Sequence, residues 1–249
     1  MDDGAAYTMI GHRGMAICNP LGSDQLDALV ALIALSGPRA GRALDVGCGK
    51  AELLIRLCER SAWAGLGIDP NATLVAEARA AIAARAPGRV EIVEAEADPQ
   101  ALPSAAYDLA AAVGASHALG GTDATLAALA VTTRQGGHVL VGDGFWRRLP
   151  DAAALDILGI PAEELHLLPE LVGAADAAGL EPLEVLVARE DDWDRYEWAH
   201  LRNLEAHAAA HPDDPQAARL WARRKRWRDA YLRAGRDLLG FALVLARKR

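Results

Sequence analysis

The sequence lacks the features of a secreted, zinc-binding or membrane-spanning protein. It contains 3 cysteines, Cys18, Cys48 and Cys58, and none lies close enough to another to suggest a zinc-binding pair or a disulfide framework. No stretch reaches the roughly 18 consecutive apolar residues of a membrane span. Residues 1–10 are acidic and lack the apolar core of a secretion signal. We therefore expect a soluble, cytoplasmic protein with no metal site and no membrane partner.

A positive charge excess is absent as well. Lys and Arg number 26 against 34 Asp and Glu, which gives a formal net charge of −8 at pH 7. Because nucleic-acid phosphates attract basic surfaces, this balance argues against a nucleic-acid partner. Residues 199–249 are the exception, with 12 basic and 5 acidic side chains. We interpret the basic run at 219–228 as a solvated helix face paired with Asp229 and Asp237, in preference to an RNA-binding surface.

Internal repeats and low-complexity tracts are also missing, and the remaining pattern indicates one α/β domain. Hydrophobic residues make up 52% of the 249 residues and charged ones 24%, enough to bury a single core. Apolar strand-like runs alternate with helical patterns and short glycine turns, which predicts a doubly wound, mostly parallel sheet. The seven predicted strands cover residues 43–46, 64–68, 89–95, 107–113, 138–142, 182–188 and 241–246.

The dinucleotide-binding glycine pattern is incomplete. The first predicted strand leads into Leu44-Asp45-Val46-Gly47-Cys48-Gly49, a glycine loop that points backbone N–H groups at a ligand above the strand ends. A dinucleotide fingerprint needs a third glycine at position 52, where this chain has Glu52. Asp45 would repel a phosphate and attract an ammonium or sulfonium group. The loop therefore favours a cationic or zwitterionic ligand.

A second acidic residue follows the second predicted strand. Asp69 lies 24 residues after Asp45, where nucleotide-binding α/β folds place an acid that accepts both ribose hydroxyls. In such sheets ligands bind at the carboxyl ends of the strands, and Glu96, Gly114 and Asp143 fall at further predicted strand ends. We expect these residues to lie near one crevice.

At this point the glycine loop resembles the first motif of class I S-adenosylmethionine-dependent methyltransferases. The resemblance extends from His12 to the last predicted strand. Over this length the sequence resembles a bacterial branch of small-molecule methyltransferases that includes the YjhP-like proteins. This resemblance is carried by Gly67-Ile68-Asp69, Val113-Gly114-Ala115 and the stretches 136–142, 145–150, 171–174 and 193–197. It implies a Rossmann-like methyltransferase fold, S-adenosylmethionine as cofactor, S-adenosylhomocysteine as product and methyl transfer to a small-molecule acceptor.

The resemblance also implies a set of cofactor-binding residues. In similar methyltransferases an acid and a small residue after the third strand hold the adenine, which favours Glu96 and Ala97, with Asp98 as the alternative carboxylate. The complete expected set is Asp45, Gly47, Cys48, Gly49, Asp69, Pro70, Glu96, Ala97, Gly114 and Ser116.

The rate of methyl transfer depends mainly on aligning the methyl donor with the acceptor and on excluding water. A base that takes the acceptor's proton helps when the acceptor is a weak acid. The candidate bases are His117, Asp143 and His12. The alternative for His117 is loop packing, and for Asp143 a structural role. In similar proteins of the branch a glutamate precedes a proline and an aromatic residue here, so Asp143-Gly144-Phe145-Trp146 departs from that pattern and the reach of the carboxylate is an open point. Trp146, Trp193, Tyr196 and Trp198 are expected either to line the acceptor pocket or to form the core of a helical cap.

We expect residues 1–249 to form a single methyltransferase domain. Residues 1–20 read as irregular chain, either a disordered terminus or a flap over the site, and residues 191–236 as a helical cap inserted before the last strand. Two other functions remain open: an NAD(P)-dependent oxidoreductase, and a non-catalytic S-adenosylmethionine-binding sensor or scaffold. The sequence leaves the acceptor and the oligomeric state open, a homodimer included.

Overall fold

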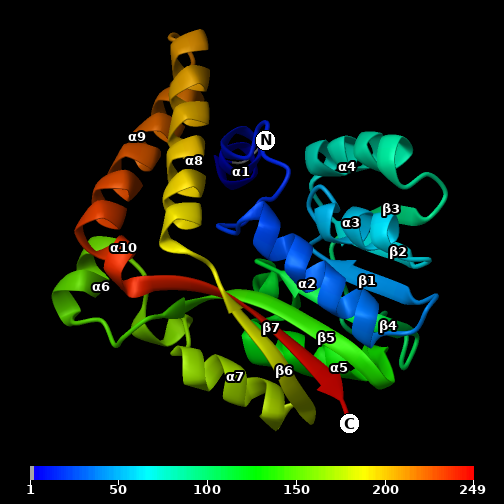
Figure 1. Ribbon diagram of the computed structural model, residues 1–249. Helices are drawn as coiled ribbons and strands as arrows, with labels where there is room; N and C mark the ends of the chain where they lie inside the picture. Colours follow the sequence, from blue (N-terminus) through cyan, green and yellow to red (C-terminus); the bar gives the residue numbers. More distant parts are fainter. Residues whose placement is uncertain (1–2) are drawn as a thin grey trace.

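A seven-stranded sheet in the order β3-β2-β1-β4-β5-β7-β6 organises the computed structural model, which describes residues 3–249 (Figure 1). Strands β1 to β5 are parallel, whereas β7 pairs antiparallel with both β5 and β6. The mostly parallel, Rossmann-like sheet is therefore confirmed. The strands are β1 (Arg42–Val46), β2 (Ala64–Asp69), β3 (Val90–Glu94), β4 (Tyr107–Val113), β5 (Thr133–Trp146), β6 (Leu180–Val187) and β7 (Leu239–Lys248).

Helices cover both faces of the sheet, because successive side chains of a strand point to opposite faces and both sets are apolar. Leu44 of β1 packs in one cluster with α5 (Thr122–Thr132) and α7 (Leu168–Ala177). Its neighbour Ala43 packs in the opposite cluster with α2 (Ser23–Ser36) and α3 (Glu52–Arg60). Helix α4 (Ala72–Arg85) packs against α3 and β3.

A helical hairpin, defined here as α8 (Glu190–Ala210) and α9 (Pro215–Ala230), rises from the sheet between β6 and β7. The chain turns at residues 211–214, where the Asp214 side chain caps α9 by accepting the Gln216 N–H at 2.9 Å. A π-helical turn (Tyr231–Gly235) and α10 (Arg236–Leu238) then lead into β7. Helix α6 (Ala152–Leu158) packs at the base of the hairpin.

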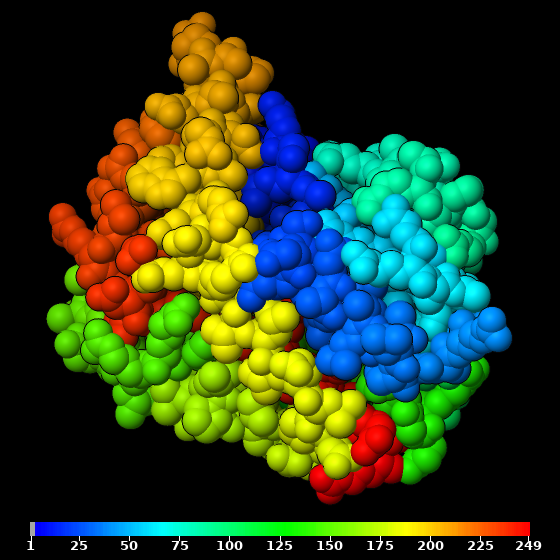
Figure 2. Space-filling model, in the orientation of Figure 1, coloured from blue at the N-terminus to red at the C-terminus, as the bar shows by residue number. Residues whose placement is uncertain are grey.

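The amino-terminal segment is a helix that contacts the hairpin. Helix α1 (Asp3–Gly11) buries Ala6 and Ile10 against Leu204 of α8 and Leu220 of α9. In the space-filling view the blue amino-terminal residues lie directly against the hairpin (Figure 2). The prediction of irregular chain is therefore wrong for residues 3–11, while residues 1–2 lie outside the described part. The sequence did not indicate α1, because the helix is short, has few apolar residues on one face and contains a glycine near each end.

Two elements differ from the sequence pattern in length. The strand predicted at residues 138–142 is longer: β5 runs from Thr133, which pairs with Tyr107 of β4, to Trp146, and β7 pairs with it from His138 onward. The sequence has a helical pattern as far as Leu168, but α6 ends at Leu158, since Gly159 adopts φ 65° and closes it, and a short 3-10 turn (Ala162–Glu164) follows.

The basic run on α9 is only partly a solvated face. Arg228 pairs with Asp229 at 2.6 Å, as expected, and Arg219 pairs with Asp3 of α1 at 3.1 Å. Arg224, however, is 2% exposed and pairs with Glu197 of α8 at 2.7 Å. One arginine of this run therefore holds the two helices of the hairpin together.

Candidate functional site

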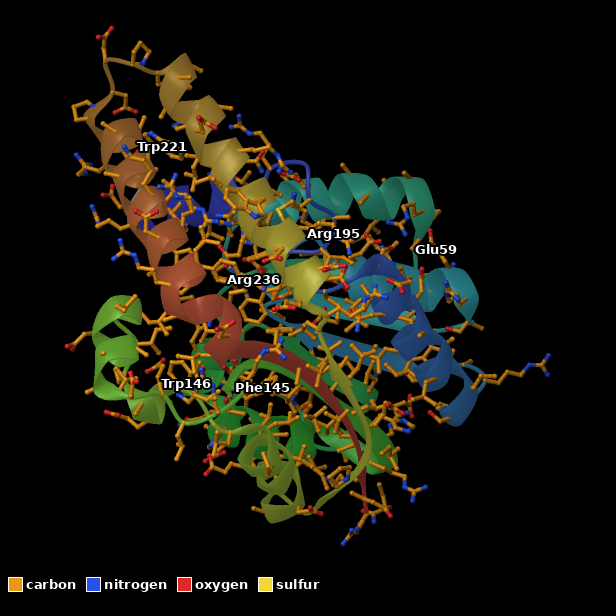
Figure 3. All side chains as sticks on the ribbon, turned by 60° about the vertical axis from the view of Figure 1, so that its left-hand side comes forward. Glu59, Phe145, Trp146, Arg195, Trp221 and Arg236 are labelled. Carbon is orange, nitrogen blue, oxygen red and sulfur yellow. The ribbon has the colours of Figure 1, made fainter. Side chains whose placement is uncertain are left out.

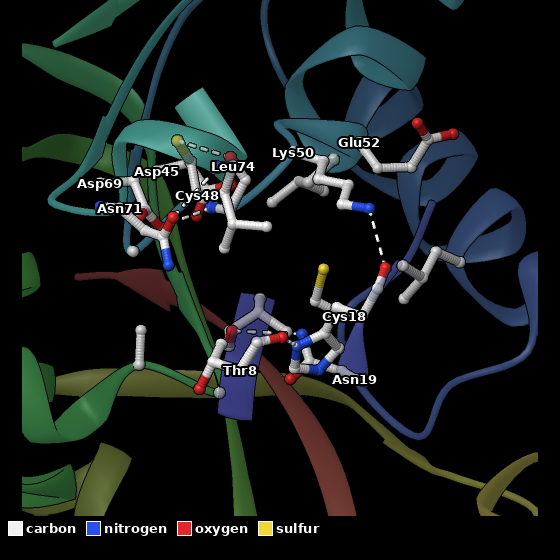
Figure 4. A pocket seen from close by; sticks show the side chains of 18 of the residues that line it. Thr8, Cys18, Asn19, Asp45, Cys48, Lys50, Glu52, Asp69, Asn71 and Leu74 are labelled. Atoms are coloured by element: carbon white, nitrogen blue, oxygen red, sulfur yellow. Dashed lines mark hydrogen bonds between the residues drawn. The ribbon is translucent and has the colours of Figure 1, made fainter. Parts of the chain in front are cut away.

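A cavity of ≈ 700 Å³ lies at the carboxyl ends of β1, β2 and β4 (Figure 4). The loops that follow these three strands form its floor, and residues 5–26 and Tyr196 of α8 line its other sides. Ligands of open α/β sheets bind at this edge, outside the carboxyl ends of the strands. The cavity is therefore the place where the predicted site residues should meet.

The glycine loop takes a backbone conformation that only glycine adopts easily. Gly47 and Gly49 have φ of 68° and 52°. A Cβ on Gly47 would lie 2.2 Å from the Cβ of Ala115, so the loop can approach the end of β4 only because the side chain is missing. The Gly47 and Cys48 N–H groups both donate to the Ile68 carbonyl, at 2.8 and 3.1 Å. The loop is thus fixed to β2.

Two carboxylates from neighbouring strands face this cavity. Asp69 accepts the Gly49 N–H at 2.8 Å and the Asn71 N–H at 2.9 Å, so its orientation is fixed. Asp45 is 4% exposed, and its Oδ1 has no hydrogen-bond partner among residues 3–249. Burial, together with the charge of Asp69, raises the pKa of the Asp45 carboxyl to about 8. A buried acid without a partner, beside a second acid, fits a cationic ligand.

The chain between α1 and α2 crosses the cavity and is tied down at both ends (Figure 4). The Lys50 ammonium donates to the His12 carbonyl oxygen at 2.9 Å and pairs with Glu77 at 2.7 Å. The Asn19 amide donates to the Val113 carbonyl at 3.3 Å. A Cβ on Gly114 would lie 2.1 Å from Asn19 Oδ1, so this contact also depends on a glycine. Residues 12–19 therefore form a strap over the strand ends.

His12 and Tyr196 form a hydrogen-bonded pair at the cavity wall. His12 Nδ1 lies 2.9 Å from the Thr8 carbonyl and Nε2 lies 3.0 Å from the Tyr196 hydroxyl. Because a carbonyl only accepts, Nδ1 carries the proton and Nε2 accepts from the phenol. Burial lowers the pKa of His12, which favours this neutral form, and burial raises the pKa of Tyr196. The pair offers a phenol whose proton has an acceptor in place.

The structure brings many of the predicted site residues to this cavity. Those that line it are His12, Asp45, Gly47, Cys48, Gly49, Asp69, Pro70, Gly114, His117 and Tyr196. Their convergence follows from parallel strands that end at one edge of the sheet.

Other predicted residues do not line it. Glu96 is exposed, Ala97 is half-buried after β3, and the Ser116 carbonyl accepts from Thr125. The role of Glu96 and Ala97 at an adenine stays a prediction. Asp143 accepts the Thr122 hydroxyl at 2.5 Å and the Gly144 N–H at 2.8 Å, which joins β5 to the start of α5.

The four predicted aromatic residues separate into different surroundings. Trp146 is 1% exposed, donates to the Ala162 carbonyl at 2.9 Å and lies near α6 at the base of the hairpin (Figure 3). Trp193 packs in the core and donates to Glu197, and Trp198 is 39% exposed. Of the four, Tyr196 reaches the cavity.

Sequence reasoning missed several cavity residues. Asn71 caps α4 by accepting the Thr73 and Leu74 N–H groups, a role that its place two residues after Asp69 could have indicated. Lys50 directly follows the glycine loop. No local signal marks the residues that α1 and the strap contribute, because their position depends on contacts with α8. The missed cavity residues include Thr8, Cys18, Asn19, Lys50, Asn71 and Leu74.

Two absences hold for residues 3–249. No group of three or more His, Cys, Asp and Glu side chains is arranged to hold a metal ion there. No helix in this part of the chain has both the length and the apolarity that crossing a membrane requires.

Comparison with known proteins identifies similar chains. A model of a methyltransferase domain matches residues 43–137. The uncharacterised protein YjhP of Escherichia coli is 32% identical over 209 residues, which cover 82% of this chain and 84% of that protein. Its crystal structure matches with a TM-score of 0.90 at 28% identity, covering 98% of this chain and 99% of that one.

Two other solved structures have closely similar folds. An S-adenosylmethionine-dependent methyltransferase from Geobacter sulfurreducens, in complex with S-adenosylhomocysteine, matches with a TM-score of 0.90 at 28% identity, over 98% of both chains. One from Thiobacillus denitrificans, in the same complex, matches with a TM-score of 0.88 at 29% identity, over 96% of this chain and 97% of that one.

Proposed function

Because this chain belongs to the S-adenosylmethionine-dependent methyltransferases, in the branch that includes YjhP, we propose that it methylates a small-molecule acceptor inside the strapped cavity. The observation that carries the proposal is the pairing of two buried acids, Asp45 and Asp69, with bare glycine backbone at the strand ends. These groups suit a ligand that combines ribose hydroxyls with positive charge.

Different residues of the cavity would contact different groups of the cofactor. Asp69 has lone pairs left for ribose hydroxyls after accepting two backbone N–H groups. Asp45 would face the positive charge, and the Gly47–Gly49 backbone allows close approach. Lys50, at the cavity wall, pairs with Glu77 and holds the strap in place over the cofactor through the His12 carbonyl. When bound, S-adenosylmethionine supplies an electrophilic methyl group on a sulfonium centre.

The residues of this chain would contribute alignment, exclusion of water and proton transfer. Helix α1 and the strap cover the strand ends, which keeps water from the reacting atoms. An acceptor hydroxyl beside Tyr196 would pass its proton to the phenol oxygen while the phenol proton moves to His12 Nε2. His117, also at the cavity wall, is a second proton acceptor. Asp143, bonded to Thr122, would act by positioning α5.

Calorimetry with purified protein tests the cofactor assignment. We expect S-adenosylmethionine and S-adenosylhomocysteine to bind and NAD to leave no signal. Asp69→Asn should weaken binding of both ligands about 10-fold or more, since it removes a charge-assisted hydrogen bond worth roughly 1.5–3 kcal/mol. Asp213→Asn, an exposed acid in the turn of the hairpin, is the matched control. NAD binding in place of the two ligands would favour the oxidoreductase instead.

The acceptor assignment needs a second assay. Label from the cofactor methyl group should appear in one or more members of a broad panel of small hydroxyl, amine, thiol and carbon acids. Cofactor binding with no transfer to any member would favour the sensor or scaffold function.

A further inference from the structure

A second cavity, of ≈ 560 Å³, lies between α1, α6 and the helical hairpin. Tyr196 lines both this cavity and the first one. Apolar and aromatic side chains form part of its wall, from Tyr7 of α1, Ile157 and Leu158 of α6 and Trp227 of α9. No role assigned so far uses this space, which is large enough for a small organic molecule.

The charged groups of this cavity leave a positive excess. Glu197 pairs with the buried Arg224 at 2.7 Å and accepts the Trp227 indole N–H at 3.0 Å, so its charge is neutralised. Arg223 and Arg226 also line the cavity, and within residues 3–249 neither forms an ion pair. Against these two free arginines stands one acid of the cavity wall, Asp156. Asp3 of α1, whose pKa is lowered by Arg219 and also by Arg223, lies nearby.

One of the two free arginines is held in position. The Arg223 guanidinium lies over the Tyr7 ring, 4.3 Å from its centroid. A cation–π contact of this geometry restricts the guanidinium while leaving its N–H groups available. Arginine in such a setting suits carboxylate or phosphate oxygens, which it binds with two parallel hydrogen bonds.

Four rings meet where the two cavities adjoin, and Tyr196 lines both. His200 lies between Tyr7, His12 and Tyr196, with ring centroids 5.3, 4.7 and 5.5 Å away. Its Nε2 is buried and has no hydrogen-bond partner in the described chain. Burial lowers the pKa of His200 to about 3, so this ring is uncharged at neutral pH. An anion in the second cavity would therefore find its charge partners only on α9.

We propose that the second cavity binds the anionic end of the methyl acceptor, an organic carboxylate or phosphate ester, between Arg223, Arg226 and Trp227, with the reacting atom at Tyr196. This assignment rests on the proposed methyl transfer and names its substrate class. The reaction forms a bond between an acceptor heteroatom and the methyl carbon, and breaks the sulfur–methyl bond, whose electron pair stays on a neutral thioether sulfur. The acceptor proton leaves to Tyr196 as the phenol proton passes to His12.

The test uses the full chain loaded with S-adenosylhomocysteine and three probes: benzoate, phenyl phosphate and the uncharged benzamide. Affinities are measured by calorimetry at constant ionic strength. At least one anion should bind 10-fold or more tightly than benzamide, and the tighter anion distinguishes a carboxylate from a phosphate acceptor. In the double variant Arg223→Gln/Arg226→Gln this preference should fall below threefold.

The matched control is Arg228→Gln, on the same helix but paired with Asp229, and it should keep the preference. Affinity for S-adenosylhomocysteine should stay within twofold in every variant, which shows that the chains are folded and the first cavity intact. Equal affinity for anions and benzamide, no binding of either anion, or an anion preference that survives the double substitution would overturn the assignment. Failure of the wild-type chain to bind S-adenosylhomocysteine would instead refute the proposed function.

Discussion

The ionisation of Asp45 is coupled to cofactor binding in the proposed site. Its pKa of about 8 means that the carboxyl is mostly protonated at neutral pH, because burial and Asp69 disfavour its charge. A cationic ligand favours the ionised form. Binding should therefore release a proton from Asp45. The pKa of this side chain then determines the pH range in which the cofactor binds tightly.

We predict that affinity for S-adenosylmethionine rises as pH increases from 6 to 8, by at most about tenfold per pH unit. Calorimetry in two buffers of different ionisation enthalpy measures the released proton. Asp45→Asn, which cannot ionise, should bind weakly and without pH dependence. A wild-type affinity that does not change over this range would contradict the protonation of Asp45.

The buried Asp45 carboxyl should also lower the free energy of unfolding of the ligand-free protein as pH rises. Its folded-state pKa lies above the ordinary value of 3.8, so between these pH values the folded chain holds a proton that the unfolded chain has lost. Stability from this group therefore falls as pH rises towards 8. Thermal unfolding should show Asp45→Asn melting about 3 °C or more above wild type at pH 8, with the difference vanishing near pH 4. A lower melting temperature at pH 8 would contradict this sign.

At the scale of elements, the contact between α1 and α8 depends on a glycine. A Cβ on Gly11 would lie 1.9 Å from His200 Cε1, while the Gly11 carbonyl accepts the Asn203 amide N–H at 2.8 Å. Gly11→Ala should therefore displace α1, cost about 1–3 kcal/mol of unfolding free energy and weaken cofactor binding. Denaturant unfolding and calorimetry measure the two effects.

A second substitution makes that prediction specific. Gly11→Ala combined with His200→Ala should lose less stability than the two single effects added, because the smaller side chain makes room for the methyl group. Gly173→Ala in α7, where a Cβ would meet nothing within 4 Å, is the control and should not destabilise. Additive losses in the double variant would show that the helix contact is not the cause.

The helical hairpin depends on the buried pair of Arg224 and Glu197. Removing one partner leaves an uncompensated buried charge, so Arg224→Met should cost about 3–5 kcal/mol. Arg224→Met combined with Glu197→Gln should recover part of that loss. Chemical denaturation of the two variants measures the recovery, and a double variant as unstable as Arg224→Met would refute the ion pair as the source.

At the scale of the molecule, the sheet and the floor of the site could be predicted, whereas its cover could not. Parallel strands buried on both faces read as apolar runs, and Gly47, Asp45 and Asp69 follow such runs directly. The position of α1 depends on α8, nearly 200 residues later, so no local pattern reveals it. The sequence likewise predicted Arg224 to lie on a solvated face, because its partner Glu197 is on the other helix of the hairpin and no local pattern links the two.

Strand β7 also determines when the fold can be completed during synthesis. It is the last strand of this sequence, yet it lies inside the sheet between β5 and β6 and is buried from Leu239 to Ala246. Until those residues leave the ribosome, β6 lacks the strand with which it pairs. A nascent chain should therefore keep an open sheet edge along β5, and a need for protection from aggregation, until β7 has been synthesised.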